Sequence, residues 1–209
     1  MKNVFLLFIL CCLVFKSNAQ NIAENKQQLA QITKVRFGAK AGLNISDTDF
    51  NRGFPAPAVP VETSWKPGVV AGFLLQVPVS GKLSIQQEYL YSQMGGKINS
   101  SGAEYAFSYL SLPVLLKYNI LPCFALLAGP QFDLLIQAKQ RINGTSSDIT
   151  HDTEERSVGA TAGLEYYVVK NLSLTARYMY GLNHIGGRQR SAATEFEYQL
   201  VQFTTDIKF

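Results

Sequence analysis

The sequence predicts an all-β protein: an eight-stranded antiparallel up-and-down transmembrane β-barrel, preceded by a cleaved signal peptide. Three observations support this prediction. Apolar and polar residues alternate with a period of two in eight segments, which is typical of strands with one apolar and one polar face. The connections between these segments alternate between long and short, as in up-and-down membrane barrels. The chain also begins with a pattern typical of an export signal.

The export signal occupies residues 1–19. Lys2 forms a short basic region, an apolar run covers residues 4–15, and small residues lead up to Ala19, where signal peptidase is expected to cut. The run is shorter than the about 20 residues that a membrane-spanning helix requires. We therefore expect cleavage after Ala19, a polar periplasmic lead-in over residues 20–34, and a barrel domain over residues 35–209.

Composition narrows the possible functions of the mature chain. Loss of Lys2 and Lys16 leaves 17 basic against 15 acidic residues, a net charge of +2, which provides no basic surface for nucleic acid. Cys123 is the one cysteine left after cleavage, so no intramolecular disulfide can form, and we interpret it as a small apolar residue at a strand start. Cys11 and Cys12 are not preceded by the small residue that a lipoprotein signal requires.

Four predicted strands form the first half of the barrel domain. The first alternates cleanly, because apolar residues occupy the odd-numbered positions from Val35 to Ile45. A tight turn at residues 80–82 joins the second and third strands, and a turn at residues 119–122 ends the fourth. Both faces of the fourth strand are apolar or aromatic in its first half, so its orientation is decided by its second half. The expected strands are residues 35–46, 67–79, 83–94 and 105–118.

Four further strands complete the prediction. Pro130 interrupts the fifth strand and indicates a β-bulge there. Lys170-Asn171 forms a two-residue turn between the sixth and seventh strands, and a long polar connection covers residues 138–156. In the last strand, apolar Val201, Phe203, Ile207 and Phe209 face opposite Gln202, Thr204, Asp206 and Lys208. The expected strands are residues 123–137, 157–169, 172–184 and 197–209.

Charged residues within these strands lie on the polar face. Alternation alone does not say which face is inside: a soluble sandwich would turn its charges to water, and a lipocalin-like barrel would have an apolar interior. The signal peptide and the terminal Phe209 favour charges inside. Because eight strands leave room only for side chains, we interpret the charges as a structural, mutually paired network and not as a pore lining. Its expected members are Arg36, Lys40, Glu88, Asp133, Glu165, Arg177, Asp206 and Lys208.

Tyrosines near strand ends also favour a membrane barrel, because aromatic belts mark both interfaces of such proteins. We expect one belt near the long connections and a second belt near the short turns. The tyrosines expected in the two belts are Tyr89, Tyr91, Tyr178 and Tyr180 for the first, and Tyr118 and Tyr166 for the second.

Several stretches resemble the PorT-like outer-membrane β-barrel family of Bacteroidetes. Their order and spacing, more than any single motif, support the likeness, which covers about residues 35–209. The resemblance implies a location in the outer membrane of a Gram-negative cell and a link to protein secretion and gliding machinery, with no catalytic motif. The last strand also resembles the signal that the barrel-assembly machinery recognises, with Phe209 at its end. The family-like stretches are residues 37–46, 109–118, 128–132, 163–167 and 172–181.

The function that we expect is that of a non-enzymatic outer-membrane protein, structural or an interaction platform, embedded in outer-membrane lipid. Loops on a rigid scaffold usually carry binding, so an unknown protein partner is expected at outer loops 47–66 and 139–156. One alternative is a small porin-like channel, and another is a secreted soluble binding barrel.

A third alternative is a lipid-modifying enzyme that uses His184 with Ser92 or Ser191. No spacing singles out a nucleophile among these residues, so no catalytic residue is assigned. A metal site is conceivable in the loop that contains His151, Asp152, Glu154 and Glu155. Loop acids are usually solvated, and a metal site needs several convergent ligands, so no metal or cofactor is assigned.

Overall fold

The computed structural model describes residues 34–49, 51, 60–99, 102–142, 144–153, 155–182 and 197–209. The expected signal peptide and all but the last residue of the lead-in lie outside the described residues. No helix in the described part of the chain is long and apolar enough to cross a membrane.

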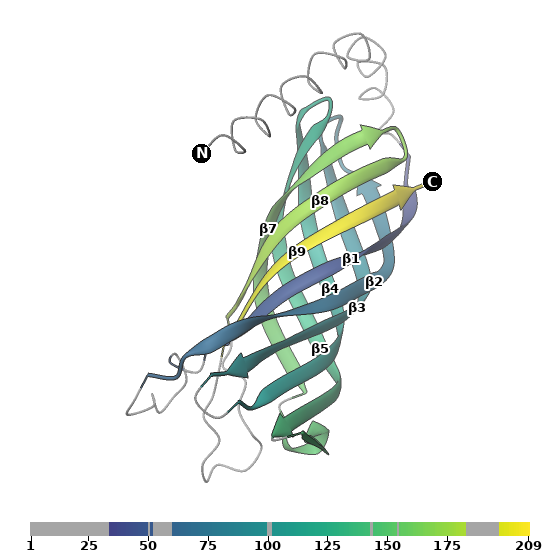
Figure 1. Ribbon diagram of the computed structural model, residues 1–209. Coiled ribbons are helices and arrows are strands. Elements are labelled where there is room, and N and C mark those ends of the chain that lie inside the picture. The colour runs from purple at the N-terminus through teal and green to yellow at the C-terminus, as the bar shows by residue number, and fades with distance from the viewer. Residues whose placement is uncertain are drawn as a thin grey trace, which may run out of the picture.

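The described strands form one antiparallel sheet that closes into a barrel (Figure 1). Eight strands follow one another in the order β4-β3-β2-β1-β9-β8-β7-β5, and β4 pairs with β5 to complete the ring. The predicted barrel is therefore confirmed. The strands are β1 (Arg36–Asp49), β2 (Thr63–Pro78), β3 (Leu83–Ile98), β4 (Glu104–Leu121), β5 (Phe124–Ile142), β6 (Thr145–Asp148), β7 (Arg156–Val169), β8 (Leu172–Gly181) and β9 (Glu197–Lys208).

The two ends of the barrel differ. Short turns join β2 to β3, β4 to β5 and β7 to β8 at one end, which we call the turn end, and the described chain both enters and leaves there (Figure 1, top). The strand ends that flank the long connections all lie at the opposite end, which we call the loop end. This alternation of short and long connections is the one expected from the sequence.

The polar face of the strands forms the interior, as the sequence analysis expects. Lys40 is only 2% exposed and Asp206 is fully buried, whereas Phe73 is 71% exposed on the outer surface. The closing pair of strands illustrates the arrangement, because Lys40 of β1 lies directly opposite Asp206 of β9. A barrel whose apolar residues face outward presents an apolar surface to the lipid of a membrane.

The prediction of a β-bulge at Pro130 is wrong. The register of β4 against β5 is the same on both sides of it, since Pro113 pairs with Gln131 and Leu116 with Ala128. The ladder accommodates the missing N–H without an additional residue. The register shifts instead between Ser108 and Tyr109, opposite Ile136.

The bulge at Ile136 has a packing reason. Leu135 and Ala138 both face the apolar interior of the loop end, which strict alternation would not allow. Ile136 is the additional residue, and it points outward with 53% of its surface exposed. The bulge thereby resets the side-chain alternation of β5.

The turn expected at residues 119–122 is shorter in the structure. β4 continues to Leu121, which pairs with Phe124, so Pro122 and Cys123 form the turn. Cys123 is half-buried in this turn and does not begin the strand. Its carbonyl accepts a hydrogen bond from the Tyr167 N–H at 2.9 Å, which holds the turn against β7.

The expected loop at residues 138–156 is largely structured. β5 runs on to Ile142 and turns back into β6, and a short 3-10 helix, η2 (Thr150–Asp152), follows. Gly144 has a φ of +85°, which permits the tight turn between β5 and β6. The polar composition of this segment reflects a hairpin exposed to water, not irregular structure.

The loop expected at residues 47–66 is also shorter, because β1 continues to Asp49 and β2 begins at Thr63. Asn51 closes the base of this connection, since its side chain donates to the carbonyl of Val61 at 2.9 Å and accepts from the N–H of Val61 at 2.7 Å. The strand expected at residues 172–184 ends at Gly181.

Candidate functional site

The barrel interior near the turn end contains most of the predicted charge network. Lys40 on β1 lies between two carboxylates, with its Nζ 2.9 Å from Asp206 on β9 and 3.3 Å from Glu88 on β3. Arg177 on β8 binds the second oxygen of Glu88 at 2.8 Å. These four side chains, three of which are fully shielded from solvent, connect four strands through the interior.

A second ionic cluster lies beside the first. Glu165 on β7 accepts from Lys117 on β4 at 2.7 Å and also from Lys208 on β9. The ring of Tyr167 lies against both amines, 4.8 Å from the Nζ of Lys117 and 5.4 Å from that of Lys208. Cation–π contact adds to the stabilisation of these desolvated lysines.

Neutral side chains add hydrogen bonds to carboxylate oxygens that already take part in ion pairs. The Gln86 amide donates to Glu88 at 2.6 Å, and the hydroxyl of Thr175 donates to Asp206 at 2.9 Å. Buried ion pairs are stable only when such additional hydrogen bonds offset the loss of water. The network therefore locks the strands to one another.

Two predicted members lie outside the ion pairs. Asp133 is buried, and its carboxylate accepts from the Gln131 amide at 3.0 and 3.2 Å. Arg36 is half-buried at the turn end, and no described residue forms an ion pair with it. Lys117 was not among the predicted members of the network. Its only signal in the sequence was its place on the same face of β4 as Ser111 and Pro113.

The interior near the loop end is apolar and aromatic. Tyr198 meets Phe107 and Tyr109 edge-on, with ring centroids 5.6 and 5.9 Å away, and the hydroxyl of Tyr109 donates to that of Tyr198 at 3.4 Å. Met94, Ala138, Met179 and Leu200 complete this interior aromatic cluster. Two chemically different layers therefore fill the barrel: ions toward the turn end and rings toward the loop end.

The aromatic cluster was missed by sequence reasoning. Two features of the sequence could have indicated it. Both faces of the stretch Tyr105–Leu110 carry apolar or aromatic residues, and Tyr198 and Leu200 lie on the otherwise polar face of β9. A strand with lipid on one side and an apolar core on the other loses its alternation.

The segment after β6 packs over this cluster at the loop end. Ile149 contacts the cluster, and Thr153 is only 6% exposed, with its hydroxyl donating to the Ile149 carbonyl at 2.9 Å. The hydroxyl of Thr150 accepts from the Ala138 N–H at 2.9 Å. Together these contacts cover one side of the interior at the loop end.

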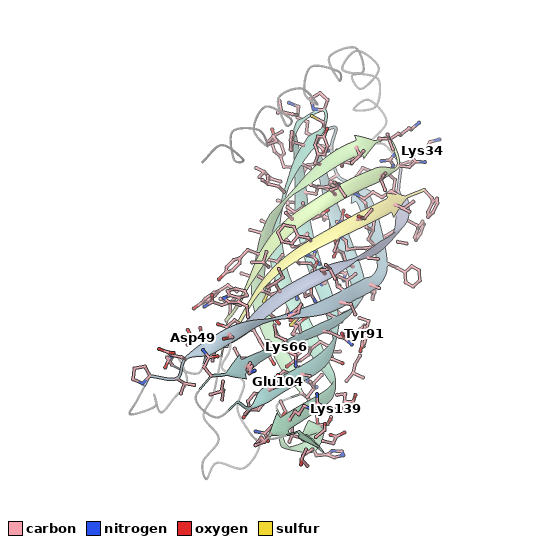
Figure 2. All side chains as sticks on the ribbon, in the orientation of Figure 1. Lys34, Asp49, Lys66, Tyr91, Glu104 and Lys139 are labelled. Carbon is pink, nitrogen blue, oxygen red and sulfur yellow. The ribbon has the colours of Figure 1, made fainter. Side chains whose placement is uncertain are left out.

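The wall of the barrel is taller on one side at the loop end. β5 pairs with β7 only up to Leu134, and beyond this residue its outer partner is β6. Glu104 on the same side forms ion pairs of 3.8 Å with Lys66 and Lys97 (Figure 2). β6 is exposed at all four positions, and β5 is its one partner among the described strands.

The alternative enzymatic residues are not brought together in the described part of the chain. Ser92 is buried inside the barrel, where it accepts from the Asn44 amide at 2.8 Å. His184 and Ser191 lie outside the described residues. His151 is exposed in η2, and no group of three or more potential ligands occurs among the described residues, which leave out Glu154.

The remaining predicted positions lie on the outer surface. Phe209 is 78% exposed, and its N–H donates to the Phe37 carbonyl at 2.8 Å, which joins the chain end to β1. Its role as an insertion signal stays a prediction. Tyr178 is exposed toward the loop end of β8. Tyr89 and Tyr91 are exposed in the middle of β3, because that strand extends beyond its predicted end.

Comparison with known proteins identifies the fold and the family. The family described as outer membrane protein beta-barrel domain matches residues 18–186. Neisserial surface protein A has a similar structure, with a TM-score of 0.52 and 14% identity over 84% of this chain and 97% of that protein. Ail, the attachment invasion locus protein of Yersinia pestis, has a TM-score of 0.50 and 14% identity over 84% of this chain and 99% of that protein. No curated protein matches the chain.

Proposed function

Because the chain belongs to the outer membrane protein beta-barrel domain family and lies in the cell outer membrane, we propose that it is a non-enzymatic anchor that presents a protein-binding surface outside the cell. In such barrels the short turns face the periplasm and the long loops face outward. The taller wall of β3 to β6 and the segments around Asn51 and η2 would form the binding surface.

The observation behind this proposal is the filled interior. Ion pairs occupy the half toward the turn end, and the aromatic cluster occupies the half toward the loop end. An eight-stranded barrel has room for little more than its own side chains. A channel would need a continuous water-filled path through the barrel, and these two layers obstruct it. Binding at the outer end is therefore the better-supported role.

The partner that we propose is a component of protein secretion machinery. This step rests on the resemblance to the PorT-like family in the stretches at residues 37–46 and 172–181. An anchor in such machinery needs a rigid barrel and an exposed edge more than it needs a pore. β6 offers such an edge at the loop end.

In-cell photo-crosslinking tests this function. A photoreactive amino acid would replace Ser146 on β6, and a matched variant would carry it at Lys170 in the turn between β7 and β8. We expect a discrete protein adduct from the first position and not from the second, with mass spectrometry identifying a secretion component. Absence of any adduct from Ser146 and from neighbouring exposed positions of β6 would contradict the proposal.

Conductance of the purified barrel in a planar bilayer is the complementary measurement. We expect no steady conductance, because buried side chains block the interior. A stable open level would support the small-channel alternative instead, and a Glu88→Ala variant would then be expected to change that level.

A further inference from the structure

The outer surface of β3, β4 and β5 changes from apolar to cationic in successive rows toward the loop end. The strand register aligns these rows across the three strands, and each row lies about 7 Å beyond the last, since a strand rises about 3.4 Å per residue. The apolar row consists of Tyr91, Leu110 and Leu134. The polar row consists of Gln93, Ser108 and Gln137.

The polar row is linked to the tyrosine of the row before it. The hydroxyls of Tyr91 and Ser108 lie 3.0 Å apart, and the Gln93 amide donates to the Tyr91 hydroxyl at 3.2 Å. Tyr91 is 41% exposed, so these groups lie on the surface and can bind an external ligand. Hydroxyl and amide groups in this row can form hydrogen bonds with the hydroxyls of a sugar.

Two cations of β5 lie beyond the polar row. Lys139 and Arg141 are exposed on β5, opposite Ala106 and Glu104 of β4 (Figure 2 labels Lys139, Glu104 and Tyr91). No described residue forms an ion pair with Lys139 or Arg141. We call Tyr91, Gln93, Ser108, Lys139 and Arg141 the outer-wall patch.

The two acids near the patch neutralise only part of its positive charge. Glu104 lies 3.8 Å from both Lys66 and Lys97, which together outnumber its single charge. Asp148 on β6 lies opposite Lys139, and it accepts from the Thr150 N–H at 2.9 Å. Hydrogen bonds from Thr150 lower the pKa of Asp148, which stays ionised and exposed. The four cations around these two acids leave a net positive surface.

This cationic surface belongs to one side of the barrel. On β1, the residues that face outward at the loop end are Asp47 and Asp49, so the rows of cations do not continue onto this strand (Figure 2 labels Asp49). Attraction of anions to every part of the rim is therefore not expected. Among the described residues, the cations are placed above a hydroxyl row and an apolar row on β3 to β5.

We propose that the outer-wall patch binds a phosphorylated glycolipid of the outer leaflet. Its acyl chains would lie along Tyr91, Leu110 and Leu134, its sugar would contact the polar row, and its phosphate would bind Lys139 and Arg141. The order of the three rows matches the order of these groups in such a lipid. Charge-assisted bonds to phosphate are the strongest of the contacts. This inference is independent of the proposed protein partner.

The test measures binding of diphosphoryl lipid A to the folded barrel in detergent micelles by native mass spectrometry. The informative variant is Lys139→Gln/Arg141→Gln. The matched control is Lys82→Gln/Lys170→Gln, which removes the same charge from exposed positions in the turns at the turn end. Different migration of heated and unheated protein in a gel confirms that each variant is folded.

We expect the Lys139→Gln/Arg141→Gln variant to bind diphosphoryl lipid A about tenfold more weakly than the wild type, because two charged phosphate contacts are lost. The control should bind like the wild type, and dephosphorylated lipid A should bind the wild type as weakly as diphosphoryl lipid A binds the variant. Equal binding by variant and wild type would overturn the proposal. Equal binding of phosphatidylglycerol and diphosphoryl lipid A would also overturn it, by indicating general adsorption of anionic lipid.

Discussion

Replacement of Glu165 by glutamine tests the ionic layer most directly. The Glu165 carboxylate is fully shielded from solvent and neutralises two lysines, Lys117 and Lys208, whose side chains are at most 1% exposed. Glutamine keeps the shape of the side chain but removes its charge. Both ammonium groups would then remain buried without a counter-ion.

The expected loss of stability follows from this geometry. Breaking a buried ion pair by removing one partner costs about 3–5 kcal/mol. The ring of Tyr167, 4.8 Å from one amine and 5.4 Å from the other, retains part of the stabilisation. We therefore expect a free energy of unfolding about 3 kcal/mol lower for Glu165→Gln.

The assay is urea unfolding of the barrel in lipid vesicles, followed by the fraction that migrates as the folded form in an unheated gel. Glu104→Gln is the matched control, since that side chain is 37% exposed and its ion pairs are 3.8 Å long. Such exposed pairs contribute about 0–1 kcal/mol.

A loss in Glu165→Gln no larger than that in Glu104→Gln would refute the reasoning. A second variant separates charge from packing. Adding Lys208→Met to Glu165→Gln removes one of the two unpaired cations, so part of the lost stability should return.

Two further predictions concern packing. Phe107→Ala should lower the free energy of unfolding by about 3–5 kcal/mol, because it opens a cavity in the interior aromatic cluster, and urea unfolding would measure it. Tyr109→Phe, which keeps the ring and removes the 3.4 Å hydrogen bond to Tyr198, should cost about 1 kcal/mol or less. A similar loss in both variants would count against a packed cluster. Gly42→Ala should reduce the yield of folded barrel, because the added Cβ would lie 2.0 Å from the Phe203 carbonyl oxygen. Gly81→Ala is the control, and it should fold like the wild type because the space around Gly81 is open. Equal yields of folded barrel from the two variants would contradict this packing argument.

The interior aromatic cluster marks a limit of sequence reasoning. Phe107, Tyr109 and Tyr198 come from strands far apart in the chain, and an aromatic residue can equally face lipid or a packed core. Periodicity distinguishes the two faces only where they differ in chemistry. Where both are apolar, only the position of the opposite wall decides which side chains meet.

The loop end shows the same limit for polar segments. Thr145–Asp148 pairs with the end of β5 because Gly144 allows a tight turn and the register brings the two segments together. In the local sequence, neither feature distinguishes this segment from a solvated loop. The bulge at Ile136 was missed because its cause is the packing of Leu135 and Ala138 against the interior aromatic cluster, which the local sequence does not show. Pro130 is visible in the sequence, but it leaves the register of β5 unchanged.

The sequence by itself determined the eight strands, their order, the two kinds of connection and the side of each strand on which charges lie. Period-two alternation and turn residues are local properties, so they can be read without coordinates. Only the tertiary structure decided that Lys117 pairs with Glu165 and that Asp133 forms no ion pair with a described residue. Partner choice depends on the stagger of the strands around the closed barrel and on distances across its interior, which sequence spacing does not contain.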